Sequence, residues 1–168
     1  IQDGEFFVML GPTGAGKTLA MLAFALRHAR KNGLRRIVLA MPFLNIVDQT
    51  AGQYQAMFSE AAGFAEHYVL EQHSLVEDLL AEPSGDAARR GNQLRRQLAE
   101  NWDAPIILTT SVQLLESLHA HKPSRCRKLH RLAGAVILLD EAQTLPPHLT
   151  PLTLATLSRL TDPQGPYR

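Results

Sequence analysis

The sequence predicts an α/β fold with a mainly parallel sheet and helices on both of its faces. Short apolar runs alternate along the chain with segments whose apolar residues have helical spacing. The run at residues 135–139 is apolar throughout, which is typical of a parallel strand that is buried on both faces.

The expected elements follow from this alternation and from turn signals. The expected strands are 5–10, 36–41, 67–70, 105–109 and 135–139. The expected helices are 17–31, 43–60, 92–101, 110–119 and 149–160, with a basic segment at 122–131 that is part loop and part helix. Asn32-Gly33 gives a helix stop signal, and Thr110 with Gln113 gives a capping box. Residues 71–86 are polar and are expected to loop out.

Length and composition are those of one ordinary globular domain, residues 1–168. The net charge of +1 provides no general attraction to nucleic acid, so any such surface must be local. The single cysteine, Cys126, excludes an internal disulfide and fits a reducing, cytoplasmic compartment. No apolar stretch approaches the roughly 18 residues of a membrane span. Because the chain lacks an initiator methionine and ends in a turn-rich stretch, we expect it to be part of a longer protein.

A glycine-rich segment predicts a phosphate-binding loop. It has the pattern Gly-x4-Gly-Lys-Thr between an expected strand and an expected helix. Its residues are Gly11, Pro12, Thr13, Gly14, Ala15, Gly16, Lys17 and Thr18. The glycines let backbone N–H groups converge on one point, and the helix adds its positive end. We expect Lys17 to contact the β- and γ-phosphates of a nucleoside triphosphate and the Thr18 hydroxyl to bind Mg²⁺.

The tetrad Asp140-Glu141-Ala142-Gln143 follows the apolar run at 135–139. Carboxylates at the tip of a buried strand are costly unless they hold a cation or transfer protons. We expect Asp140 to hold Mg²⁺ through water. We expect Glu141 to act as general base on a water that attacks the γ-phosphate. This arrangement favours hydrolysis over transfer to another acceptor.

Several polar residues are candidates for contact with nucleic acid. Thr109 and Thr110 stand before a helix N-terminus that could bind a phosphate, although capping alone also explains Thr110. Asn45 and Gln49 share one helix face and either contact nucleic acid or face solvent. The basic segment at 122–131 is compatible with phosphate binding or with an ordinary solvated face.

These motifs together resemble the first RecA-like lobe of superfamily two helicases of the DEAD/DEAH group. Residues 41–49 look like motif Ia of that group, and residues 105–113 look like its later DNA-contacting motif. The segments Ser-Arg-Cys-Arg-Lys-Leu-His at 124–130 and Asp-Glu-Ala-Gln-Thr-Leu-Pro-Pro at 140–147 are similar to the CRISPR-associated helicase–nuclease of type I systems.

The resemblance implies a prokaryotic motor that moves along single-stranded DNA, uses ATP with Mg²⁺ and serves CRISPR antiviral defence. A surveillance complex with guide RNA would deliver it to a displaced strand. Gln143 would link the nucleotide to DNA binding, although it also fits a polar turn, and Pro42 would join Asn45 and Gln49 at the DNA.

The resemblance also implies parts that this sequence does not contain. These are a nuclease domain with clustered His and Asp ligands, a second RecA-like lobe with an arginine finger, and the motif III strand. We therefore expect the strands near Val8 and Val136 to flank an empty slot and the isolated segment to hydrolyse ATP very slowly.

Two other functions fit the same residues. One is a superfamily two motor lobe from restriction, repair or RNA remodelling. The other is a non-catalytic module that senses a nucleotide or docks a partner, against which the intact set Lys17, Thr18, Asp140 and Glu141 argues.

Overall fold

The computed structural model describes residues 7–12, 14–62, 69–72, 102–119 and 123–161. At its centre lies a sheet of four strands, all parallel, in the order β2-β3-β1-β4. The strands are β1 (Arg36–Met41), β2 (Val69–Gln72), β3 (Ile106–Thr110) and β4 (Ala135–Leu139). The predicted α/β class with a parallel sheet is confirmed.

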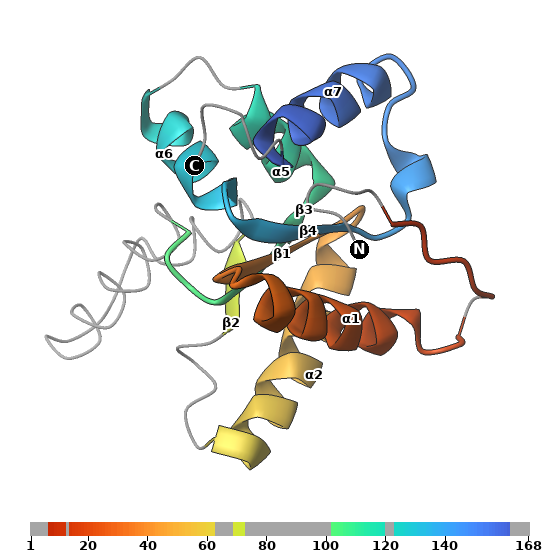
Figure 1. The fold of residues 1–168 in the computed structure, drawn as a ribbon. Helices are drawn as coiled ribbons and strands as arrows, with labels where there is room; N and C mark the ends of the chain where they lie inside the picture. The colour runs from red at the N-terminus through yellow and green to blue at the C-terminus, as the bar shows by residue number, and fades with distance from the viewer. Residues whose placement is uncertain (1–6, 13, 63–68, 73–101, 120–122, 162–168) are drawn as a thin grey trace, which may run out of the picture.

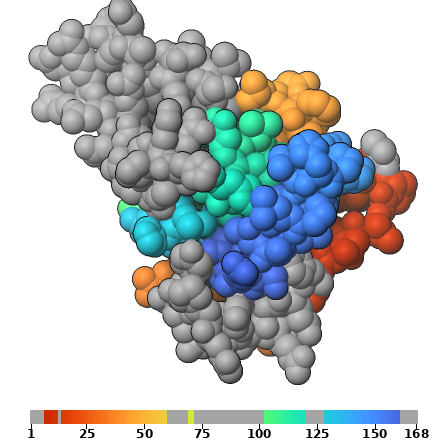
Figure 2. All heavy atoms as spheres, turned by 90° about the horizontal axis from the view of Figure 1, so that it is seen from above, coloured from red at the N-terminus to blue at the C-terminus, as the bar shows by residue number. Residues whose placement is uncertain are grey.

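Helices cover both faces of the sheet (Figure 1). On one face lie α1 (Lys17–Asn32) and α2 (Leu44–Ala62). On the other lie α5 (Ser111–Leu118), α6 (Pro123–Leu132) and α7 (Thr150–Thr161), which Figure 2 shows from above. In the part of the chain that the structure describes, no helix combines the length and apolar content required to cross a membrane.

Two apolar clusters form the core, one on each face of the sheet. Side chains of α1 and α2 pack with Leu39 and Val136 in the first cluster, and those of α5, α6 and α7 pack with Val38 and Ile107 in the second. In β4, Val136 and Leu138 are buried, whereas the residues that point to the other face are only half-buried. The predicted burial of this strand on both faces is therefore complete on one face and partial on the other.

The expected strand at 5–10 is wrong for its described part. Residues 7–10 form no strand, and all four are exposed, Val8 to 83%. A strand requires a neighbour for its ladder of hydrogen bonds. The outer edge of β4 pairs with no other described strand, and the segment around Val8 does not pair with it. The predicted slot between two strands is thus not formed, because only one of its two sides is a strand.

The other predicted boundaries differ by small amounts. Strand β2 extends to Gln72, so residues 71 and 72 belong to the sheet and not to the expected loop. The basic segment is helical from Pro123 to Leu132. The predictions for residues 5–6, 67–68, 73–86, 92–101 and 163–168 lie outside the described residues, as do those for Lys122 and the side chain of Cys126.

A charged cluster lies at the amino end of the sheet, and we call it the amino-end cluster. Asp103 Oδ1 is 2.9 Å from a guanidinium nitrogen of Arg36 and 3.3 Å from one of Arg131. The ammonium group of Lys128 lies 5.5 Å from the ring centroid of Trp102, a side chain that is fully buried. The contacts of Arg131 and Lys128 join the segment before β3 to α6, and the contact of Arg36 joins that segment to the start of β1, so the cluster connects elements of the fold.

Candidate functional site

The glycine-rich loop forms the turn into α1. Gly14 has φ 80° and Gly16 has φ 73°, a left-handed conformation that glycine adopts without a steric penalty. A Cβ atom on Gly11 would lie 3.4 Å from the aliphatic part of the Lys17 side chain, so the loop passes close to its own lysine. Thr13 lies outside the described residues. The sequence pattern and the backbone conformation therefore agree on a compact turn that leads into a helix N-terminus.

The acidic tetrad begins where β4 ends. The Asp140 amide still donates to the Ala40 carbonyl at 2.9 Å, which places Asp140 at the carboxyl end of the sheet. Glu141 then takes the left-handed conformation, φ 50° and ψ 47°, which is uncommon for a residue other than glycine. Its amide donates to Asp140 Oδ1 at 3.0 Å, and its carbonyl accepts from the Thr144 hydroxyl at 2.8 Å. After this reversal of the chain, the Glu141 carboxylate lies within 3.9 Å of Lys17, the lysine of the glycine-rich loop.

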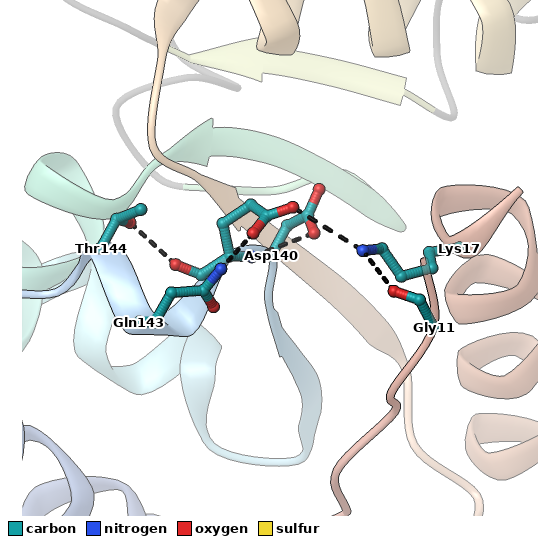
Figure 3. A network of polar contacts seen from close by, with 6 residues as sticks. Gly11, Lys17, Asp140, Gln143 and Thr144 are labelled. Carbon is teal, nitrogen blue, oxygen red and sulfur yellow. Dashed lines mark hydrogen bonds and ion pairs between the residues drawn. The ribbon is translucent and has the colours of Figure 1, made fainter. Parts of the chain in front are cut away.

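Lys17 is the point where the loop and the tetrad meet, as Figure 3 shows. Its Nζ donates to the Gly11 carbonyl at 3.0 Å and lies 3.9 Å from Glu141 Oε1. The other carboxylate oxygen of Glu141 accepts a hydrogen bond from the Gln143 side-chain amide. The side chains of Lys17 and Glu141 are 26% and 38% exposed, and an ion pair this long and this exposed contributes little stability. The ammonium group is therefore only weakly bound to its present partners.

Sequence reasoning did not single out Tyr54, which lies behind this site. Its hydroxyl donates to the main-chain carbonyl of Thr18 at 3.0 Å, and its side chain is fully buried. Burial, and then the negative charge of Asp140, raise the pKa of Tyr54 to about 12. The available signal was its place on the buried face of α2, because a buried tyrosine hydroxyl usually requires a hydrogen-bond partner.

The nucleic-acid candidates fall into two groups. Asn45 and Gln49 are exposed on α2 and Pro42 is half-buried before it, so all three remain possible contacts. The expectation for Thr109 is not supported, because its side chain is fully buried in β3. Thr110 is 7% exposed, and its hydroxyl accepts from the Gln113 amide at 3.2 Å. Its helix-capping role is confirmed, and this leaves its hydroxyl poorly placed for DNA.

The described part of the basic segment is only partly solvated: His130 is exposed and the Arg131 side chain is 38% exposed. Lys128 is only 7% exposed beside Trp102, and Arg131 is paired with Asp103. The spacing of basic residues along a helix cannot reveal these contacts, because Trp102 and Asp103 lie more than 20 residues earlier in the sequence. The proposed phosphate-binding role of this segment therefore has no support at Lys128 or Arg131.

The sheet, the glycine-rich turn before α1 and the acidic pair after β4 are the parts of a RecA-like P-loop domain. Over residues 2–146 the chain matches the family model described as "Type III restriction enzyme, res subunit", and it belongs to this family. It is also 32% identical over 144 residues to the CRISPR-associated nuclease/helicase Cas3 of Haloferax volcanii. The match covers 80% of this chain and 15% of that relative. Both findings support the resemblance seen in the sequence: the lobe is Cas3-like and of the superfamily two helicase type.

Proposed function

We propose that this chain is the lobe of a helicase-type motor that binds and hydrolyses Mg·ATP to drive movement along single-stranded DNA. The observation that carries the proposal is the position of Lys17 between the glycine-rich loop and Glu141. An ammonium group that is held by one carbonyl and one distant carboxylate can exchange both for phosphate oxygens, which bind it more strongly.

The residues present fit a nucleoside triphosphate. The turn at Gly14 and Gly16 and the N-terminus of α1 supply N–H donors for phosphate. The Thr18 hydroxyl and the Asp140 carboxylate are oxygen ligands of the kind that Mg²⁺ uses together with phosphates and water. When bound, Mg²⁺ neutralises charge on the β- and γ-phosphates. Gln143 would sense the nucleotide through its hydrogen bond to Glu141.

Glu141 is the proposed general base. Its carboxylate is held from one side by Gln143, and its backbone direction is fixed by the turn that Thr144 closes. Once Lys17 binds phosphate, the Glu141 carboxylate is free to accept the proton of the attacking water. The same residue thus neutralises the lysine before ATP binds and takes a proton afterwards.

The wider role is proposed from the Cas3 relative, which is named as a nuclease and helicase. We propose that the complete protein acts with a guide-RNA surveillance complex in CRISPR defence, and that a second lobe and a nuclease domain belong to it. On the DNA side we propose Asn45, Gln49 and Pro42 as contacts. A motor of a restriction enzyme is the second candidate, because the matching family model carries that description.

The test compares Lys17→Ala with Lys31→Ala in the full protein. Lys31 is an exposed lysine in the last turn of the same helix, so it controls for loss of charge on α1. We expect Lys17→Ala to weaken Mg·ATP binding by about 100-fold, the equivalent of one or two charge-assisted hydrogen bonds. Lys31→Ala should bind Mg·ATP normally. Equal affinities of the two variants would refute the ATP site.

The substrate is tested by the rate of ATP hydrolysis with single-stranded DNA, duplex DNA or RNA added to the same protein. Stimulation by single-stranded DNA alone supports the proposed motor. Stimulation by duplex DNA alone favours the restriction candidate, and stimulation by RNA alone contradicts both.

A further inference from the structure

The strongest additional feature of the structure is the contact between α2 and the first turn of α1. Tyr54 projects from α2, and its hydroxyl donates to the Thr18 carbonyl at 3.0 Å across 36 residues of sequence. In an α-helix that carbonyl already accepts from the amide four residues later, here that of Leu22. Tyr54 therefore adds a second donor to a carbonyl that the helix itself would satisfy. This contact is not required to satisfy the helix backbone.

The contact is made to one of the two residues proposed to bind Mg²⁺. Thr18 carries both the carbonyl that accepts the hydrogen bond from Tyr54 and the hydroxyl that is proposed to bind Mg²⁺. The negative charge of Asp140, the other proposed ligand, adds to the effect of burial in raising the pKa of Tyr54. The ring itself is fully buried in the cluster formed by α1, α2 and the sheet, so its position is fixed by packing.

We propose that Tyr54 is a positioning residue for Mg·ATP, which sets the place of Thr18 relative to Asp140 by holding the first turn of α1 against α2. The inference rests on the proposed function and adds a residue that the phosphate-binding and acidic motifs do not contain. A metal held by two oxygen ligands from different elements requires both to be placed closely, because Mg²⁺ has strict octahedral geometry. A hydrogen bond from a rigid, buried ring provides this restraint.

The direct test is Tyr54→Phe in the full protein, which removes the hydroxyl and keeps the ring. The matched control is Thr50→Val, one turn earlier on α2. Thr50 is also buried, and its hydroxyl donates to the Met41 sulfur at 3.6 Å and not to α1. Both variants lose a buried hydroxyl from the same helix, but only one loses a contact with the glycine-rich loop's helix.

We expect Tyr54→Phe to weaken Mg·ATP binding by about three- to tenfold, the equivalent of one hydrogen bond. Binding of ATP in the presence of EDTA should change less, because the restraint acts through the metal ligand. Thr50→Val should leave both affinities unchanged. Equal Mg·ATP affinities of Tyr54→Phe and Thr50→Val, both measured where circular dichroism indicates a folded protein, would overturn the inference.

A double-mutant cycle separates positioning from a general loss of stability. If Tyr54 acts through Thr18, then Tyr54→Phe should have little further effect on Mg·ATP affinity when Thr18 is already Ala. Additive losses would contradict the inference. Hydrogen exchange of the Leu22 amide, measured without nucleotide, provides a second readout. The exchange should be faster in Tyr54→Phe than in Thr50→Val. Equal exchange rates would also contradict the inference.

The proposed function and this inference fail in different ways. If Lys17→Ala does not weaken Mg·ATP binding, the proposed ATP site is wrong, and the proposed role of Tyr54 is then wrong as well. If Lys17→Ala does weaken binding and Tyr54→Phe matches its control, only the inference about Tyr54 is overturned.

Discussion

The two ends of the sheet carry similar residues in opposite states. At the amino end, Asp103 has short contacts with Arg36 and Arg131, and Lys128 lies buried over Trp102. At the carboxyl end, Lys17 and Glu141 are 3.9 Å apart and partly exposed. The first set of charges makes short contacts that connect elements of the fold, although the buried Nε of Arg36 has no hydrogen-bond partner among the described residues. The second is loosely paired, which is the state expected of groups that must exchange partners with a ligand.

The largest expected effect that tests the contrast between the two ends of the sheet is a loss of stability at the amino end. Trp102→Ala should lower the free energy of unfolding by about 3–5 kcal/mol, because a fully buried aromatic side chain leaves a cavity. Phe43→Ala, which removes a 59% exposed aromatic residue at the carboxyl end, should change it by less than about 0.5 kcal/mol. Urea denaturation measures both. Similar losses would mean that the two ends do not differ as described.

At the carboxyl end the expected loss is in catalysis. Glu141→Gln keeps the size of the side chain and removes the proposed base, so ATP turnover should fall by about 100-fold or more while Mg·ATP still binds. Glu116→Gln on α5 is the control for a change of charge. Full turnover by the Glu141 variant in a DNA-stimulated hydrolysis assay would show that another group activates the water.

A third prediction concerns pH and Tyr54. Its folded-state pKa of about 12 lies above the ordinary value of 10. The hydroxyl therefore contributes stability that is fully present below pH 10 and is lost as the pH rises toward 12. Relative to Tyr54→Phe, the wild type should lose about 2 kcal/mol of unfolding free energy across that window. Parallel pH profiles of the two proteins would contradict the buried, hydrogen-bonded state of this residue.

The smallest expected effect compares one carboxylate from each end. Asp103→Asn should lower the free energy of unfolding by about 1 kcal/mol, because it weakens contacts with two arginines. Glu141→Gln should leave stability almost unchanged, because its ion pair with Lys17 is long, 3.9 Å against 2.9 and 3.3 Å for the contacts of Asp103. Thermal unfolding of the two variants side by side would sharpen the comparison. A larger loss for Glu141→Gln would reverse it.

The carboxyl-end site was largely predictable from sequence, because its residues lie in two short continuous motifs. The loop at 11–18 and the tetrad at 140–143 each follow local rules of spacing, and the structure brings Lys17 and Glu141 together as the motifs imply. Strands β1, β3 and β4 were predictable for the same reason, since each is an apolar run bounded by turn signals.

The errors concern features that depend on distant residues. The apolar segment at 7–10 has strand-like composition, yet a strand forms only beside a partner. Lys128 looked like part of a solvated basic face, and its burial depends on Trp102. Tyr54 was not singled out from the sequence, because its hydrogen bond depends on Thr18, 36 residues away. Local pattern carries no information about such contacts.

Two described residues other than glycine have positive φ angles, Trp102 at 51° and Glu141 at 50°, one at each end of the sheet. Such a conformation costs roughly 1 kcal/mol for an ordinary side chain. At Trp102, burial of the indole ring offsets the cost. At Glu141 the side chain is 38% exposed and buries no comparable surface, and asparagine or glycine would suit the backbone better. A glutamate at this position is thus not the residue that best fits the backbone, which agrees with its proposed role as the general base. Thermal unfolding of Glu141→Asn, expected to be at least as stable as the wild type yet inactive, would measure that trade-off.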